Sequence, residues 1–175
     1  MPKFRVPVED YKFLFKHVFD MEANYKSLDC ADDFSVDILE AILEEAAKFS
    51  ENELAPLYQS GDEEGCSLKD GVVTTPSGFK EAYTKFIEGG WTSLTGEPDL
   101  GGQGLPSSVS LAVNEMLTTA NWAWAMYPGL SEGAVATLES HGTDQQKKDY
   151  LPKLIDGKWS GTMCLTEPHC GTDLG

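Results

Sequence analysis

Apolar side chains recur every three to four residues along most of the chain, which is the period of an amphipathic α-helix. Segments with this period alternate with stretches rich in glycine, proline or charged residues. The segments that we predict to be helical, about six in number, span residues 8–20, 35–54, 79–87, 107–120, 128–140 and 143–155. The pattern therefore favours an all-α fold for most of the chain.

Capping residues locate several helix ends. Ser35 is a predicted N-cap, because its hydroxyl can accept a hydrogen bond from a free backbone N–H. Thr143 and Gln146 have the spacing of a capping box, in which each residue satisfies a backbone donor of the other. Gly89 follows the third helix, where glycine is common. Pro128 fits a first turn better than a helix interior, so we expect the fifth helix to begin there.

The segment 8–20 carries an aromatic-rich stripe that we expect to dock on the rest of the molecule. The stripe consists of Tyr11, Leu14, Phe15, Val18 and Phe19. Residues 22–33 have the composition of a polar connection. Residues 59–77 are turn-rich, with a short extended piece at 72–74. Two irregular regions are therefore expected between the first three helices.

The pattern changes at residue 160. Residues 160–166 are β-prone and form the first predicted strand, in which Cys164 is expected to be buried. One strand cannot satisfy its own backbone groups, so further strands are needed to complete a sheet. We therefore predict an amino-terminal extension at residues 1–34, a helical domain at 35–158, and the truncated start of a β-domain at 159–175.

Composition narrows the function classes. Hydrophobic residues make up 41% of the 175 residues and no apolar run is long enough to span a bilayer, so we expect a cytoplasmic protein without membrane insertion. The net charge of -16 disfavours nucleic acid as a partner, because phosphate backbones would be repelled. The four cysteines form no CxxC pair and the three histidines are scattered, so we predict reduced thiols and no metal site.

Two segments are candidates for ligand binding. The glycine-rich stretch 96–106 contains neither GxxxxGK[ST] nor GxGxxG, so we interpret it as a tight loop in which glycines supply positive φ. The segment from Thr166 to Thr172 is more specific, because Pro168 would end the strand and Gly171 would let a ligand approach the backbone. Backbone N–H groups between the two threonine hydroxyls could receive the oxygens of a pyrophosphate.

Residues 164–175, Cys-Leu-Thr-Glu-Pro-His-Cys-Gly-Thr-Asp-Leu-Gly, closely resemble the flavin-binding strand and loop of the acyl-CoA dehydrogenase family. Three further segments resemble the same family in the same order: residues 90–106, the stretch around Asn114, and residues 142–154. The likeness covers residues 36–175. The helix at 8–20 resembles the extra amino-terminal helix of a larger subgroup that includes the 3-methylthiopropionyl-CoA dehydrogenases.

The resemblance implies a helical amino-terminal domain, a middle β-domain and a helical carboxy-terminal domain, with FAD as the cofactor. The residues that it implies for FAD binding are Met163, Leu165, Thr166, Gly171 and Thr172. Thr166 would hydrogen-bond the isoalloxazine ring, and Gly171 and Thr172 would face the pyrophosphate. Thr172 would also lie near the thioester arm of an acyl-CoA substrate.

The resemblance places no catalytic residue in this chain, because the family's general base comes from the later helical domain. Glu167 belongs to the motif and is interpreted as structural, and His169 as an exposed turn residue. Trp122, Trp124 and Tyr127 fall where the family's helical domain borders the acyl pocket. Either they pack in the core, or Trp124 shortens the pocket as a substrate-binding residue and favours small acyl groups.

For a full-length protein, the resemblance implies oxidation of an acyl-CoA to the 2,3-enoyl-CoA. The substrate would be 3-methylthiopropionyl-CoA or another short- or medium-chain thioester. Electron-transferring flavoprotein would be the redox partner, and the protein would form a homodimer or homotetramer. The 175 residues alone are expected to be inactive and to bind FAD weakly. Two other classes remain open: a flavoprotein relative acting in the DNA-damage response, and a helical interaction module.

Overall fold

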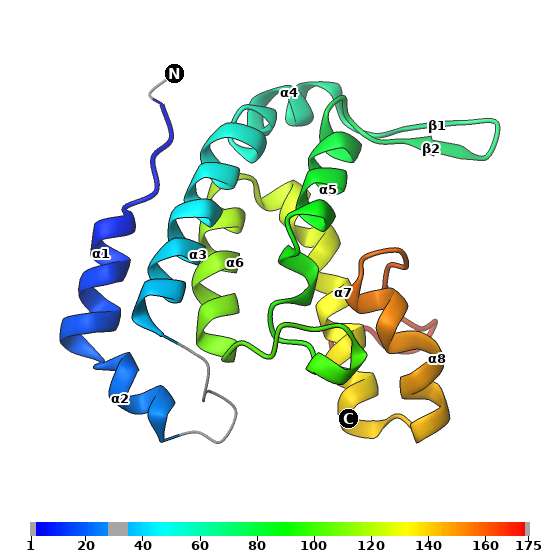
Figure 1. Ribbon diagram of the computed structural model, residues 1–175. Helices are drawn as coiled ribbons and strands as arrows, with labels where there is room; N and C mark the ends of the chain where they lie inside the picture. Colours follow the sequence, from blue (N-terminus) through cyan, green and yellow to red (C-terminus); the bar gives the residue numbers. More distant parts are fainter. Residues whose placement is uncertain (1–2, 28–34, 174–175) are drawn as a thin grey trace.

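The computed structural model describes residues 3–27 and 35–173, which form a helical bundle with a small β-hairpin (Figure 1). The helices are α1 (Val8–Phe13), α2 (Met21–Lys26), α3 (Val36–Phe49), α4 (Leu57–Glu64), α5 (Phe79–Glu88), α6 (Ser107–Ala120), α7 (Trp122–His141) and α8 (Asp144–Ile155). Two π-helical turns, η1 (Leu14–Val18) and η2 (Ser50–Leu54), continue α1 and α3. Two 3₁₀ turns, η3 (Trp91–Ser93) and η4 (Pro98–Leu100), follow α5, and the hairpin consists of β1 (Ser67–Lys69) and β2 (Val72–Thr74).

The core lies where α3, α5, α6 and α7 meet, with α3 and α6 side by side (Figure 1). Its most completely buried side chains include Leu39, Leu43, Leu54, Phe86, Val109, Val113, Met116 and Leu117. The buried residues Leu39, Leu43, Ala46 and Ala47 of α3 are spaced mostly three to four apart, so the apolar period of the sequence determines which face of the helix points inward. The predicted all-α fold class is therefore confirmed.

Two predicted caps are confirmed. The Ser35 hydroxyl accepts a hydrogen bond from the backbone N–H of Ile38 at 3.3 Å. At the start of α8, the Thr143 hydroxyl accepts from the N–H of Gln146, whose side chain accepts from the N–H of Thr143 in return. Each cap joins residues that are three apart in the chain, so both caps could be predicted from the local sequence.

The expected start of the fifth helix at Pro128 is wrong. Helix α7 begins at Trp122, because the Asn121 side chain accepts a hydrogen bond from the N–H of Trp124 at 3.1 Å and serves as the N-cap. Pro128 lies inside the helix and is buried. Its ring has no N–H, so it cannot donate to the carbonyl of Trp124 one turn earlier.

The turn-rich interpretation of residues 59–77 is partly wrong, because residues 59–64 belong to α4. Gly61 lies inside this polar helix, and a Cβ there would come within 2.7 Å of the Phe79 ring. The glycine therefore permits α4 to pack against the start of α5. The extended piece at 72–74 is confirmed as β2. The glycine-rich loop 96–106 contains η4 and has positive φ at Gly101 and Gly104, as predicted.

The aromatic stripe of the amino-terminal segment docks only in part. Tyr11 and Phe15 pack against the core, whereas Leu14, Val18 and Phe19 are exposed. The π-helical turn η1, in which the N–H of Phe19 donates to the carbonyl of Leu14, is wider than an α-helical turn and rotates the second half of the stripe outward. Residues 22–26 of the expected polar connection belong to α2, and residues 28–33, with Cys30, lie outside the described residues.

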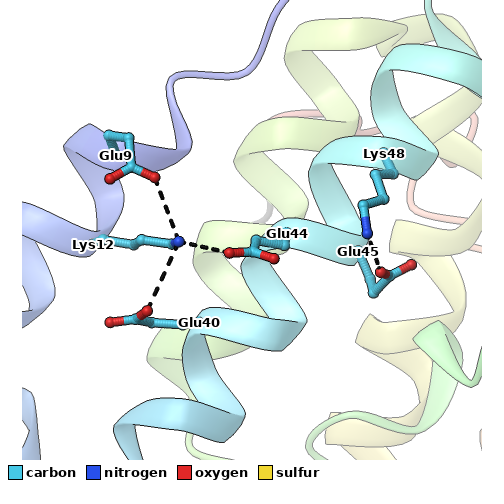
Figure 2. Close-up of polar contacts among 6 residues, drawn as sticks. All are labelled: Glu9, Lys12, Glu40, Glu44, Glu45 and Lys48. Carbon is cyan, nitrogen blue, oxygen red and sulfur yellow. Dashed lines mark hydrogen bonds and ion pairs between the residues drawn. The ribbon is translucent and has the colours of Figure 1, made fainter.

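Polar contacts tie this extension to α3. The Nζ of Lys12 lies 2.6 Å from Glu44, 3.4 Å from Glu9 and 3.8 Å from Glu40 (Figure 2). Buried groups hold it as well: Tyr25 is 2% exposed and its hydroxyl contacts that of Ser108 on α6. Since exposed ion pairs contribute little, the buried aromatic side chains are the main anchor and the ion pairs add to it.

The predicted strand at residues 160–166 is not present. The segment forms neither helix nor strand, and among the described residues no neighbouring strand pairs with it. An isolated bridge joins Glu167 and Cys170 just beyond it. Cys164 is correspondingly exposed rather than buried, and it is a free thiol like Cys66 and Cys170.

Candidate functional site

The candidate site lies along α7 and the extended segment 159–173 that follows α8. Asn121 positions the start of α7 in two ways, since it caps the helix and its side-chain amide donates to the carbonyl of Leu54 at 3.3 Å. Asn121 is 1% exposed. This buried contact fixes where α7 begins relative to the end of η2, and therefore which of its side chains face outward.

Trp124 points into an aromatic core cluster. Its ring packs edge-on against Phe86 with centroids 5.3 Å apart, and Phe49 and Tyr83 lie at 6.1 and 6.3 Å. The indole N–H donates to the carbonyl of Phe79 at 3.1 Å. Trp124 is 3% exposed, so the structure places it in the core, which is the core-packing alternative of the sequence interpretation.

The outer face of the first turns of α7 is apolar and exposed. Trp122, Met126 and Tyr127 are 60%, 47% and 53% exposed, an unusual density of large apolar side chains for a protein surface. Tyr127 also packs edge-on against Tyr83, with centroids 4.9 Å apart. Its hydroxyl shares a hydrogen bond of 2.9 Å with the hydroxyl of Ser160. The exposed face of α7 is thus joined directly to the extended segment.

A second contact holds the extended segment against α7. The N–H of Gly161 donates to the buried hydroxyl of Ser131 at 3.0 Å. A Cβ on Gly161 would lie 2.5 Å from the Cβ of Ala134, so the backbones can approach this closely only at a glycine. Ser131 and Gly161 were not identified from the sequence, because their contact joins residues 30 apart.

The candidate flavin-binding residues lie on the exposed end of this segment. Glu167 and Cys170 exchange backbone hydrogen bonds of 2.8 and 3.3 Å, which closes a tight turn through Pro168 and His169. Thr166 and Thr172 flank the turn with exposed side chains. A Cβ on Gly171 would lie 3.9 Å from the Thr166 side chain, so the two ends of the turn are close together.

The other candidate residues follow the same segment. Met163 and Leu165 are exposed, as are Glu167 and the turn residue His169. The structure therefore brings five of the six candidates together on one exposed segment, and leaves Trp124 apart from them in the core. An exposed row of hydroxyl, glycine and apolar side chains can bind a planar or phosphorylated ligand along one edge but cannot enclose it.

A small cavity of about 70 Å³ lies between α7, α8 and the loop before η4. Two carboxyl groups seven residues apart on α7, Glu132 and Glu139, line it together with Thr92 and Thr95. Burial raises the pKa of Glu132, although the Asn114 side chain donates to it at 3.0 Å. Burial and the nearby Glu97 raise the pKa of Glu139. The cavity is too small for a nucleotide or an acyl chain, so these groups belong to the interior of the domain.

The sequence model of the acyl-CoA dehydrogenase N-terminal domain matches residues 37–158. The chain belongs to the acyl-CoA dehydrogenase family. The resemblance noted at residues 90–106, around Asn114 and at 142–154 falls inside this match, and the helices α3 to α8 are the structure that carries it.

Several acyl-CoA dehydrogenases of known name are similar to this chain and support its assignment to the family. A 3-methylmercaptopropionyl-CoA dehydrogenase of Ruegeria pomeroyi is 40% identical over 171 residues, which are 98% of this chain and 29% of that protein. A butyryl-CoA dehydrogenase of Syntrophomonas wolfei is 30% identical, over 96% of this chain and 28% of its own length. A broad-specificity linear acyl-CoA dehydrogenase of Mycobacterium tuberculosis is 32% identical, over 82% of this chain and 23% of its own length.

The chain thus spans less than a third of the length of these relatives. In the part of the chain that the structure describes, no helix is long and apolar enough to cross a membrane.

Proposed function

We propose that these residues are the amino-terminal part of an FAD-dependent acyl-CoA dehydrogenase that oxidises a short linear acyl-CoA to the 2,3-enoyl-CoA. The observation that carries the proposal is the exposed segment Met163–Thr172, which directly follows Ser160 and Gly161, the two residues that hydrogen bonds join to Tyr127 and Ser131 of α7. The apolar outer face of α7 can line an acyl chain while the adjacent segment binds the cofactor.

The residues present fit one edge of a flavin site. The exposed Thr166 hydroxyl can donate to or accept from a polar ring atom, and the backbone around Gly171 is open enough for a phosphate to approach. Thr172 adds a hydroxyl that both the pyrophosphate and the thioester arm could reach. When bound, FAD supplies the two-electron chemistry by accepting the β-hydride. The base that removes the α-proton would come from residues outside this chain.

The outer face of α7 would form one wall of the acyl pocket. Met126 and Tyr127 present apolar surface beside the extended segment. Trp124, for which the sequence left open either core packing or a direct role in shortening the pocket, would act through the packing of Tyr83 and Phe86 behind that wall. The substrates in the names of the Ruegeria pomeroyi and Syntrophomonas wolfei relatives support a short linear acyl group, such as 3-methylthiopropionyl or butyryl.

The proposal extends to partners. Electron-transferring flavoprotein would accept the electrons in the cytoplasm, and the full-length protein would form a homodimer or homotetramer. A role in DNA binding is disfavoured, because the net charge of -16 would repel phosphate. A purely helical interaction module would not require the exposed Thr166–Thr172 turn.

The test uses the full-length protein. It should purify with bound flavin, and acyl-CoA should bleach that flavin with formation of the enoyl product. Because each variant removes one ligand hydrogen bond, worth about 1 kcal/mol, Thr166→Ala and Thr172→Ala should weaken FAD binding several-fold. Thr119→Ala is the matched control, since Thr119 is exposed on α6 and bonds only within its own helix.

Two results would refute the proposal. One is a full-length protein that neither retains flavin nor oxidises any short acyl-CoA. The other concerns the chain of 175 residues by itself, which should bind FAD weakly. Stoichiometric flavin on that chain would contradict the view that it supplies only one edge of the site.

A further inference from the structure

The β-hairpin is the most exposed apolar element outside the candidate site. It projects from the α5 side of the molecule, away from α1 and α2 (Figure 1). Leu68, Val72 and Val73 are 73%, 65% and 64% exposed. Side chains this exposed bury little of their apolar area against the rest of the described chain, so most of this surface is free to contact something else.

The hairpin nevertheless has a well-specified structure. Asp70 and Gly71 form its two-residue loop, both with positive φ (52° and 79°), which is the combination of a type I′ turn. Asp-Gly is a preferred pair for this turn, so the local sequence sets the register. A two-stranded hairpin without further contacts is only marginally stable in water. A defined arm of this kind is therefore expected to gain its remaining stability from a surface that it contacts.

The register gives the hairpin two different faces. Leu68 lies directly opposite Val73, so one face presents a pair of large apolar side chains. Lys69 lies opposite Val72 and Ser67 opposite Thr74, so the other face is mixed and partly charged. Because side chains alternate across a strand, Leu68 and Val73 can be buried together while Lys69 remains in solvent.

We propose that the Leu68–Val73 face is a docking surface for the part of the same polypeptide that follows residue 175. This inference rests on the proposed function, because a full-length dehydrogenase supplies that part. The chain spans 29% of the length of its Ruegeria pomeroyi relative, so a polypeptide of similar length has ample chain to cover the arm.

The size of the face favours this occupant over a second copy of the protein. A free-standing stable interface needs about 800 Å² from each partner, far more than two side chains of a hairpin supply, whereas a linked domain is already at high effective concentration.

The test exploits two neighbouring valines of nearly equal exposure on opposite faces. In the full-length protein, the photo-crosslinker p-benzoylphenylalanine replaces either Val73 or Val72. After irradiation, the Val73 position should give a crosslink to a peptide beyond residue 175, with a yield several-fold above that of the Val72 position. The crosslinked protein should migrate as a single polypeptide on a denaturing gel.

A second measurement does not depend on the crosslinker. Trypsin should cleave after Lys69 slowly in the wild-type protein, because cleavage requires the backbone of the arm to open and docking of the opposite face holds the two strands paired. The double variant Leu68→Ser, Val73→Ser should be cleaved at least about tenfold faster, since proteolysis follows the population of the open arm. Val72→Ser, on the opposite face, should be cleaved at the wild-type rate.

Any other outcome of the crosslinking experiment contradicts the proposed docking surface. A crosslinked dimer would show that a second copy covers the arm, and equal yields at both valines, or none, would show that nothing covers the Leu68–Val73 face. Flavin content and acyl-CoA oxidation are measured on the same preparation. An active flavoprotein without the crosslink refutes the docking surface alone, whereas a crosslinked protein without flavin refutes the proposed function alone.

Discussion

The indole N–H of Trp124 donates to the backbone carbonyl of Phe79 at 3.1 Å, which joins α7 to the first residue of α5. Phe79 also packs against Gly61, so this contact connects three helices. Trp124→Ala should lower the free energy of unfolding by about 3–5 kcal/mol, because it opens a cavity in the aromatic cluster. Trp124→Phe keeps an aromatic ring but removes the donor and part of the ring volume, and should cost about 1–3 kcal/mol.

Urea unfolding followed by helical circular dichroism would measure both changes. The control is Trp122→Phe, at a position 60% exposed on the same helix, which should shift the free energy of unfolding by less than about 0.5 kcal/mol. Equal effects at Trp122 and Trp124 would contradict the core position of Trp124.

Lys12 provides a prediction about the amino-terminal extension. Its hydrogen bond with Glu44 lowers the pKa of Glu44 and raises the pKa of Lys12 (Figure 2). Lys12→Gln should weaken the docking of α1 on α3, seen as faster hydrogen exchange in α1 and faster cleavage after Lys16. Lys48→Gln is the control, because Lys48 pairs with Glu45 on α3 itself.

The pH dependence of that docking follows from the same pair. The contribution of Glu44 is present above its ordinary pKa of 4.5 and is lost as the pH falls through its lowered folded-state pKa. The contribution of Lys12 is present below 10.5 and is lost as the pH rises through its raised pKa. Protection of α1 should therefore be greatest between these limits, and an unchanged profile in Lys12→Gln would argue against the pair.

The fold could be predicted from sequence wherever the decisive contact is local. The caps at Ser35 and Thr143 join residues three apart, and the long apolar period of α3 needs no distant partner to be recognised. Helix α4 was missed because it is polar and contains Gly61. A glycine is needed at this position because a Cβ would collide with the Phe79 ring of α5, a contact that the local sequence does not reveal. The start of α7 was misplaced because the sequence prediction relied on the restriction imposed by Pro128 alone, whereas the Asn121 cap starts the helix at Trp122 and leaves Pro128 inside it.

The candidate site was predictable only along one segment. Residues 163–172 are contiguous, so their resemblance to a flavin-binding loop could be read directly. Their attachment to α7 through Ser131 and Tyr127 joins residues 30 and 33 apart and has no local signal. The β-prone composition of 160–166 predicted a strand, but a strand also requires a pairing partner, which composition does not specify.

Glu132 should make the stability of the domain depend on pH. Burial raises its pKa, so its favourable contribution is fully present below the ordinary value of 4.5 and is lost as the pH rises through the raised value. Glu132→Gln should leave the melting temperature unchanged near pH 4 and raise it near pH 8, because glutamine can still accept from Asn114. Exposed Glu88→Gln is the control, and a Glu132→Gln variant less stable at both pH values would contradict the argument.

Gly161 gives the most direct test of how the extended segment is held. A Cβ at this position would lie 2.5 Å from the Cβ of Ala134 and 3.1 Å from backbone atoms of Leu130 and Ser131. Neither the backbone nor the alanine methyl group can move aside easily. Gly161→Ala should therefore push the segment off α7 and break the hydrogen bond to Ser131. Gly133→Ala is the control and should be tolerated, because a Cβ there meets no atom within 4 Å. Hydrogen exchange in residues 159–173 would report the loss of contact, and flavin content of the full-length protein should fall with it. Unchanged exchange in Gly161→Ala would show that the segment does not depend on this close approach.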